Sequence, residues 1–234
     1  MTDNYIGNEL DLFKDATNWK KYFSRKINNF IKGDVLEVGA GLGANTFFLS
    51  QNIKNINSIT CLEPDKDLCE KIRFNNSQSH FQIKKIINGT IEIIEDYYDT
   101  IIYIDVLEHI EDSKKEIELI KKKLKKNGHL IILVPAFNFL FSEFDKNIGH
   151  FRRYNKKMLK DDINNQLVTK KLFYLDSMGF IASLINKLIL RKNTPSKQNI
   201  LFWDKILINF SKFFDLLIFF KFGKSLIGIY EKKE

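Results

Sequence analysis

Apolar runs of strand length alternate with longer, helix-like segments up to about residue 135. Several of the short runs are continuously apolar, as strands covered on both faces are. The predicted strands are 35–39, 58–63, 82–87, 100–105 and 129–134, and the predicted helices are 43–52, 65–76 and 112–126. Strands that alternate with helices indicate a doubly wound, mostly parallel sheet. Such a sheet binds ligands at the carboxyl ends of its strands.

The helix over 112–126 has recognisable ends. Ser113 and Glu116 have the S-x-x-E spacing of a capping box, so we expect Ser113 to cap the first turn. The pair Asn127-Gly128 favours the left-handed turn that ends a helix.

The rest of the chain is less regular. A helix near 156–165, a strand near 168–175 and a final strand over about 224–232 are predicted. Together with the five strands above, these two make seven. The predicted fold class is therefore α/β, with a seven-stranded, Rossmann-like sheet. No Pro-, Gly- or Ser-rich linker divides the chain, so we expect a single domain over 1–234.

Two strongly apolar segments, 177–190 and 200–222, precede the final strand. Lys205, Asn209 and Lys212 form a narrow polar stripe at helical spacing along the second segment. No stretch of about 18 uncharged apolar residues occurs, so neither segment is predicted to span a membrane. The residues 200–222 are expected either to cover the sheet as a lid over a pocket or to lie on a membrane surface.

The charge of the chain is positive but dispersed. The 37 Lys and Arg residues exceed the 29 Asp and Glu residues, which gives a net charge of +8 and a pI of about 9.2. Concentrated charge of this size would favour a nucleic-acid or anionic-membrane partner. The densest block, 121–126, lies at the end of a predicted helix, where cations complement the helix dipole.

Cysteine usage and the first residues indicate a reducing, cytoplasmic setting. Cys61 and Cys69 are too few for a disulfide framework, and no Cys/His spacing of a metal site occurs, so no metal is expected. The first fifteen residues contain no apolar stretch that could act as a secretory signal. Nothing in the sequence indicates an oligomeric state.

The strongest chemical signal is the segment DVLEVGAGLGANT, 34–46, in which a strand runs through closely spaced glycines into a helix. A loop of this kind lets a ligand approach the backbone and the free N–H groups of the helix. With Ala44 as the last small residue it also satisfies G-x-G-x-x-G/A, which leaves a nicotinamide-dependent oxidoreductase as an alternative. Glu37 suits a cationic amino group better than a pyrophosphate. Glu63, at the end of the second strand, is placed to accept hydrogen bonds from ribose hydroxyls, which predicts a nucleoside ligand.

Four segments together resemble the class I S-adenosylmethionine-dependent methyltransferases: VLEVGAGLG, CLEPD, DTIIYIDVLEHIED and LKKNGHLIILVPA. The resemblance covers about 33–135. It implies a cofactor-binding half over about 30–135 and an acceptor-binding half with the lid over about 136–222.

By resemblance, Glu37 and the glycines hold the methionine part of S-adenosylmethionine, Glu63 holds the ribose, and Asp105 lies at the sulfonium end. Asn88 stands where the family commonly has an acidic residue at the adenine. The residues expected to bind the cofactor are Glu37, Gly39, Gly41, Gly43, Asn45, Glu63, Pro64, Asn88, Gly89, Asp105, Val106 and Leu107.

Methyl transfer needs an acceptor aligned with the methyl group and, for some acceptors, a base that takes its proton. His109 and His150 are the candidate bases, although His109 could equally hydrogen-bond a loop. The segment DVLE replaces the Pro-Pro and aromatic pattern of enzymes that methylate amines of nucleic-acid bases, so nucleic acid is a less expected acceptor. A non-catalytic module that binds a nucleoside remains a further alternative.

The segment GHFRRY, 149–154, follows the fifth predicted strand and resembles a bacterial subgroup connected with glycan or lipid modification. Arginine binds carboxylate or phosphate with two parallel hydrogen bonds, which favours an anionic acceptor. The alternative is that the arginines pair with Asp145, Asp161 or Asp162 and brace the lid. The predicted acceptor-binding residues are Arg152, Arg153, Tyr154 and Tyr174. The expected acceptor is a small molecule, a sugar or a lipid-linked molecule, methylated at O, N or C.

Overall fold

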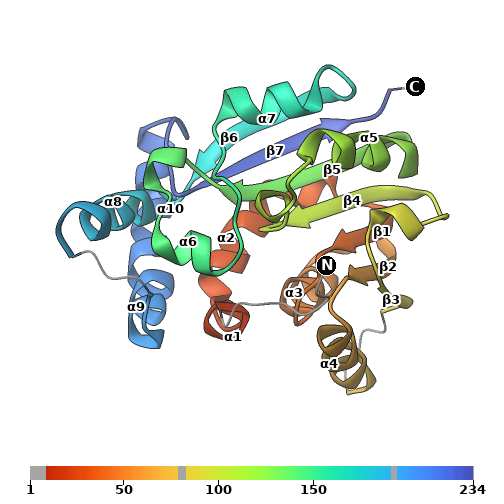
Figure 1. Cartoon of the computed structure of the whole chain (residues 1–234), viewed down its shortest axis with the longest axis horizontal. Helices are drawn as coiled ribbons and strands as arrows, with labels where there is room; N and C mark the ends of the chain where they lie inside the picture. Colours follow the sequence, from red (N-terminus) through yellow and green to blue (C-terminus); the bar gives the residue numbers. More distant parts are fainter. Residues whose placement is uncertain (1–8, 79–82, 191–193, 234) are drawn as a thin grey trace.

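The computed structural model describes residues 9–78, 83–190 and 194–233. A seven-stranded sheet of order β3-β2-β1-β4-β5-β7-β6 runs through the molecule (Figure 1). The first five strands are parallel, and β7 pairs antiparallel with both β5 and β6. The strands are β1 (Gly33–Val38), β2 (Ile56–Glu63), β3 (Lys85–Asn88), β4 (Tyr98–Ile104), β5 (Leu124–Pro135), β6 (Val168–Leu175) and β7 (Ser225–Glu231).

This sheet confirms the predicted fold class. Residue 82, the first of the predicted third strand, lies outside the described residues. The largest difference is at β5, which begins at Leu124 inside the predicted helix 112–126. Leu124 is fully buried and pairs with Tyr98, and Asn127 adopts a positive φ of 59° within the strand. Packing of Leu124 therefore ends the helix before the Asn-Gly turn.

Helices cover both faces of the sheet, with α5 and α7 along one side and α3 and α4 along the other in Figure 1. The helices are α1 (Glu9–Phe13), α2 (Thr17–Ile27), α3 (Ala44–Asn52), α4 (Lys66–Ser77), α5 (Ser113–Lys123), α6 (Glu143–Asn147), α7 (Lys156–Ile163), α8 (Ser177–Ile185), α9 (Lys197–Phe202) and α10 (Ile208–Leu217). Two π-helical segments, Asn186–Leu190 and Trp203–Leu207, follow α8 and α9.

The N-cap of α5 differs from the prediction. Asp112 is the cap, and its carboxylate accepts a hydrogen bond from the backbone N–H of Lys115 at 3.0 Å. Ser113 instead donates to Asp162 at 2.7 Å, and Glu116 accepts from the Tyr103 hydroxyl at 2.6 Å. Contacts with distant segments therefore engage the two side chains that the capping-box spacing assigned to the helix start.

Successive residues of each strand enter two separate cores, because side chains alternate across a sheet. Val35, Ile102 and Ile131 face the core beneath α2, α3 and the last helices of the chain. Leu36 and Tyr103 face the core beneath α5 and α7. Both faces are therefore buried, which explains the continuously apolar strands.

The lid segment, defined as 177–222, is fixed to the sheet and to α2 by buried carboxylates. Asp176 accepts hydrogen bonds from Trp203 Nε1 and Ser211 Oγ, both at 2.7 Å. Asp215 accepts from the Tyr22 hydroxyl and the Asp176 backbone N–H, both at 2.8 Å. Asp204 accepts from the backbone N–H of Trp19 at 2.8 Å. Each of these carboxylates is at most 3% exposed. Residues 191–193 of the segment lie outside the described residues.

The helical stretch 203–217 has a polar buried face and an apolar exposed face. Asp204, Ile208, Ser211 and Asp215 recur at helical spacing and are buried. The exposed apolar side chains of the segment include Phe202, Ile206, Phe210, Phe213, Leu216, Leu217 and Phe219. Within the described residues, no helix combines the length and apolar character needed to cross a membrane.

Candidate active site

One cavity lies where the carboxyl ends of β1, β4 and β5 meet the N-terminal helices and the lid segment. Its wall includes the glycine loop, the loop after β4, the loop after β5 and the residues just before β7. Of the predicted site residues, the structure brings together Gly39, Gly41, Asn45, Asp105, His109, His150 and Arg153 on this wall.

The glycine loop presents its backbone to the cavity. Gly39, Gly41 and Gly43 have φ values of 65°, 57° and 74°, which side chains rarely tolerate. A Cβ on Gly39 would lie 2.5 Å from Val106 Cγ2. The first turn of α3 has no side-chain cap, and Ala44 and Asn45 of this turn line the cavity. The loop thus offers backbone N–H groups to a ligand.

The predicted carboxylates lie directly behind this loop. Glu37 is 3% exposed and accepts a short hydrogen bond from the Thr46 hydroxyl, and burial raises its pKa to about 7. Glu63 accepts hydrogen bonds from the backbone N–H groups of Gly41 at 2.7 Å and Asp65 at 3.0 Å. Burial raises the pKa of Glu63 as well. Glu63 therefore supports the glycine loop and Glu37 the first turn of α3, and neither carboxylate belongs to the cavity wall.

The residues predicted to contact the adenine are hydrogen-bonded to one another and to Glu63. Asn88 Nδ2 donates to the carbonyl oxygens of Glu63 at 3.0 Å and Pro64 at 2.7 Å. The Gly89 N–H donates to the Glu63 carbonyl at 3.0 Å. Pro64, Asn88 and Gly89 do not contribute to the cavity wall.

Asp105 directly follows β4 and lines the cavity. Its φ of 54° is strained for a side-chain-bearing residue, and its N–H donates to the Leu133 carbonyl at 2.8 Å. The side chain faces the open space of the cavity. The surrounding protein removes part of its hydration, which raises the pKa of Asp105 to about 6. Val106 packs beneath Gly39, and Leu107 is fully buried in the core.

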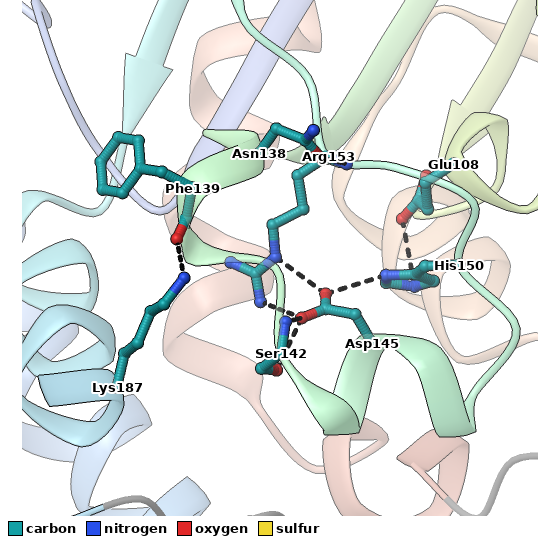
Figure 2. A network of polar contacts seen from close by, with 8 residues as sticks. All are labelled: Glu108, Asn138, Phe139, Ser142, Asp145, His150, Arg153 and Lys187. Carbon is teal, nitrogen blue, oxygen red and sulfur yellow. Dashed lines mark hydrogen bonds and ion pairs between the residues drawn. The ribbon is translucent and has the colours of Figure 1, made fainter.

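The two predicted bases lie together although they are distant in sequence. The rings of His109 and His150 meet edge to face, with centroids 4.5 Å apart. His150 Nδ1 lies 3.0 Å from Asp145 Oδ1, and His150 Nε2 lies 3.8 Å from Glu108 Oε1 (Figure 2). Burial, together with His150, lowers the pKa of His109 to about 4.

Arg153 both pairs with Asp145 and reaches the cavity wall. Its Nε and Nη2 donate to the two oxygens of Asp145, each at 2.8 Å, so it braces the loop as the alternative interpretation held (Figure 2). The contacts with His150 and Arg153 keep the pKa of Asp145 well below its usual range, although burial alone would raise it. The side chain of Arg153 also reaches the cavity wall, where its Nη1 is buried and has no hydrogen-bond partner among the described residues.

The other predicted acceptor-binding residues lie away from the cavity wall. Arg152 donates to Ser113 Oγ at 3.1 Å and to the Glu111 carbonyl at 2.7 Å. Tyr154 is fully buried in the core. Tyr174 stacks on Phe137 at a centroid distance of 4.7 Å. Adjacent side chains in an extended segment point in opposite directions, which explains why only Arg153 faces inward.

Sequence reasoning missed several residues of the cavity wall. Phe13, Trp19 and Lys20 come from α1 and α2, which were not predicted. The apolar face of α2, formed by Trp19, Tyr22, Phe23 and Ile27, was a usable signal. Lys224 also lines the cavity, and its Nζ lies 4.7 Å from the centroid of the Trp203 ring. Its pKa is lowered by burial.

Comparisons with known proteins agree with the fold. A family model described as a methyltransferase domain matches residues 36–130. A search of curated proteins finds no match. A methyltransferase from Clostridium acetobutylicum has a TM-score of 0.60 at 12% identity, over 94% of this chain and 93% of its own.

Two further solved structures are similar. A putative sarcosine dimethylglycine methyltransferase from Galdieria sulphuraria has a TM-score of 0.60 at 18% identity, over 92% of this chain and 85% of its own. The N-methyltransferase NodS from Bradyrhizobium japonicum, solved with S-adenosylhomocysteine, has a TM-score of 0.58 at 13% identity, over 94% of this chain and 88% of its own.

The fold, the family model and the loop geometry point the same way. The antiparallel β7 between β5 and β6 departs from the six parallel strands typical of nicotinamide-binding domains. The uncapped helix start and the exposed glycine backbone fit a nucleoside cofactor with a charged amino acid part. Residues 36–130 therefore match a methyltransferase domain, and the whole chain has the fold of solved S-adenosylmethionine-dependent methyltransferases.

Proposed function

We propose that this methyltransferase modifies a negatively charged small-molecule, sugar or lipid-linked acceptor at O, N or C. The observation that carries the proposal is a single cavity shared by the glycine loop, two histidines and the cationic side chains of Arg153 and Lys224, among others. The glycine loop faces one side of this cavity, while His150, Arg153 and Lys224 face it from the loop after β5 and the start of β7.

Glu37, Gly39 and Gly41 would hold the methionine part of the cofactor, Glu63 the ribose and Asn88 the adenine. The bound cofactor supplies a methyl group on a sulfonium, which is an excellent leaving group. Asp105, at the end of β4, would lie near the sulfonium. The task left to the chain is to align the acceptor and exclude water.

His150 has the surroundings of a general base. The Asp145 carboxylate accepts from Nδ1, so a neutral ring carries its lone pair on Nε2. A carboxylate that fixes the tautomer of an imidazole in this way is the arrangement used in catalytic triads. His109, whose ring meets that of His150, is the second candidate.

A cationic donor without an acceptor favours an anionic substrate. The buried Nη1 of Arg153 has no hydrogen-bond partner among the described residues, and an oxygen of the acceptor would supply one. Lys224 adds a second cation to the same wall. A carboxylate or phosphate group on the acceptor would therefore be attracted and oriented.

The exposed face of the lid segment supports a lipid-linked acceptor and peripheral membrane contact. Its apolar side chains are joined by exposed cations, Lys187, Lys197, Lys205 and Lys221, whereas Asp204 and Asp215 are buried. An apolar face with cationic neighbours is typical of helices that lie on anionic membranes.

The test is incubation of the protein with methyl-labelled S-adenosylmethionine and a metabolite and lipid extract, followed by mass spectrometry of labelled products. We expect a labelled anionic product, and we expect His150→Gln to slow its formation while S-adenosylhomocysteine still binds. Glu63→Ala should instead weaken binding of S-adenosylhomocysteine. Failure of the wild-type chain to bind it would refute the site assignment. Unchanged turnover in both His109→Gln and His150→Gln would refute the histidines as bases.

A further inference from the structure

Glu108 is a buried carboxylate without a hydrogen-bond partner. It is 0% exposed, and neither of its oxygens has such a partner among the described residues. The ion-pair contact with His150 Nε2, at 3.8 Å, is too long for a hydrogen bond. A buried carboxylate in this state needs either a proton or a cation.

The neighbours of Glu108 have the spacing of metal ligands. Ligand atoms of Glu108, His109 and His150 all lie within 4.8 Å of one another, and all three residues line the cavity. Two ligand atoms bound at about 2.0–2.2 Å to one ion lie roughly 3–4 Å apart. The 3.8 Å between Glu108 Oε1 and His150 Nε2 falls in that range, and small side-chain rotations would bring in the third ligand.

Surrounding groups fix the two imidazoles. His150 Nδ1 is held by Asp145, which directs Nε2 toward Glu108 (Figure 2). Asp145 is itself fixed by Arg153. A carboxylate that holds the distal nitrogen of a metal-binding histidine is a regular feature of metal centres. The backbone of Gly149 hydrogen-bonds His109 and so orients that ring.

The charge balance also favours a cation. Four carboxylates interact electrostatically at this end of the cavity: Asp105, Glu108, Asp145 and Asp176. The cationic side chains among them are Arg153 and Lys224. Asp105 and Asp145 therefore repel a negative charge on Glu108, and a bound cation would offset this repulsion.

We propose that Glu108, His109 and His150 form a binding site for a divalent transition-metal ion of the zinc type. Two imidazoles and one carboxylate suit such an ion, whereas Mg²⁺ prefers oxygen ligands alone. Coordination positions left open toward the cavity would take an oxygen of the anionic acceptor. This role rests on the proposed function, and with the ion bound the histidines serve as ligands rather than as bases. No metal-ligand spacing is visible along the chain, because His150 reaches the other two ligands only through the fold.

Metal binding can be measured without methyl transfer. The untagged full-length chain is stripped with a chelator and titrated calorimetrically with Zn²⁺ and, separately, with Mg²⁺. We expect saturable binding of a single Zn²⁺ and much weaker binding of Mg²⁺. Glu108→Gln and His150→Gln should weaken Zn²⁺ binding by more than the roughly 10- to 100-fold that loss of an outer partner costs. Glu111→Gln, exposed in the same loop, and His129→Gln, outside the cluster, should leave it intact.

Co²⁺ provides a second measurement on the unmutated chain, because its visible absorption reports nitrogen and oxygen coordination. Absence of saturable Zn²⁺ binding and of this absorption in the folded chain would overturn the proposal, as would equal affinity in Glu108→Gln and the wild type. Titration with S-adenosylhomocysteine separates the two hypotheses. A chain that binds it but no Zn²⁺ keeps the methyltransferase site and loses the metal site; a chain that binds Zn²⁺ but not S-adenosylhomocysteine does the reverse.

Discussion

Replacement of Glu37 by Gln should stabilise the cofactor-free protein and weaken cofactor binding. Burial raises the pKa of Glu37 to about 7 from its ordinary 4.5. Below pH 4.5 the carboxyl group is protonated in both the folded and the unfolded chain. Between pH 4.5 and 7 the unfolded chain has released this proton while the folded chain retains it, so the free energy of unfolding falls as pH rises.

The size of the effect follows from the two pKa values. The difference between about 7 and 4.5 corresponds to about 3 kcal/mol at pH 8, where the whole loss has occurred. Because the side chain of Glu37 is only 3% exposed, solvent screening hardly reduces this free-energy difference. Glu37→Gln keeps an oxygen that accepts from Thr46 and removes the charge. The variant should match the wild type near pH 4.5 and exceed it by about 3 kcal/mol at pH 8.

Urea unfolding followed by tryptophan fluorescence, at several pH values from 5 to 8, measures this difference directly. Glu118→Gln, the same substitution at an exposed position of α5, provides the control and should give a difference that does not vary with pH. In calorimetry at pH 6, S-adenosylhomocysteine should release a proton from the wild type and not from Glu37→Gln. A stability difference that is the same at pH 5 and pH 8 would contradict the reasoning.

Three further substitutions test the loop, the lid segment and its exposed face. Gly39→Ala should destabilise the fold by about 1–2 kcal/mol or more and reduce S-adenosylhomocysteine affinity, because φ is 65° and the new Cβ meets Val106; thermal unfolding and calorimetry check both effects. Asp215→Ala should cost about 3 kcal/mol, since it leaves the Tyr22 hydroxyl and two backbone N–H groups buried without an acceptor; a thermal midpoint equal to that of the wild type would disprove this. Joint replacement of Phe210 and Phe213 by Ser should reduce sedimentation with anionic vesicles while the thermal midpoint stays within about 1–2 °C, because both side chains are more than half exposed.

The strands and the glycine loop could be predicted because their signals are local. Continuous apolar runs specify buried strands, and closely spaced glycines specify a turn that side chains would block. β6 begins and ends where the pattern placed it, at Val168 and Leu175. Most of the predicted cofactor-binding residues stand at the ends of these strands or in this loop. Their positions in the fold could therefore be predicted along with the elements.

The acceptor side could not be predicted to the same degree, because it depends on contacts between distant segments. Arg152 and Arg153 are equivalent in sequence, and only the pairing of Asp145 with one of them shows which faces inward. The sequence showed one polar side of the last helix, the stripe of Lys205, Asn209 and Lys212. The structure places a second polar side, with Asp204 and Asp215, in the interior, where partners from α2 satisfy both carboxylates.

These two carboxylates couple the beginning of the chain to its end. Trp19 and Tyr22 supply donors to Asp204 and Asp215, which follow about 190 residues later, and both aspartates would lose these donors if α2 were missing. During synthesis these contacts of α2 therefore cannot form until nearly the whole polypeptide has emerged. Trp19, Lys20, Trp203 and Lys224 all belong to the cavity wall, so the wall is complete only once both ends of the chain have been made and have met.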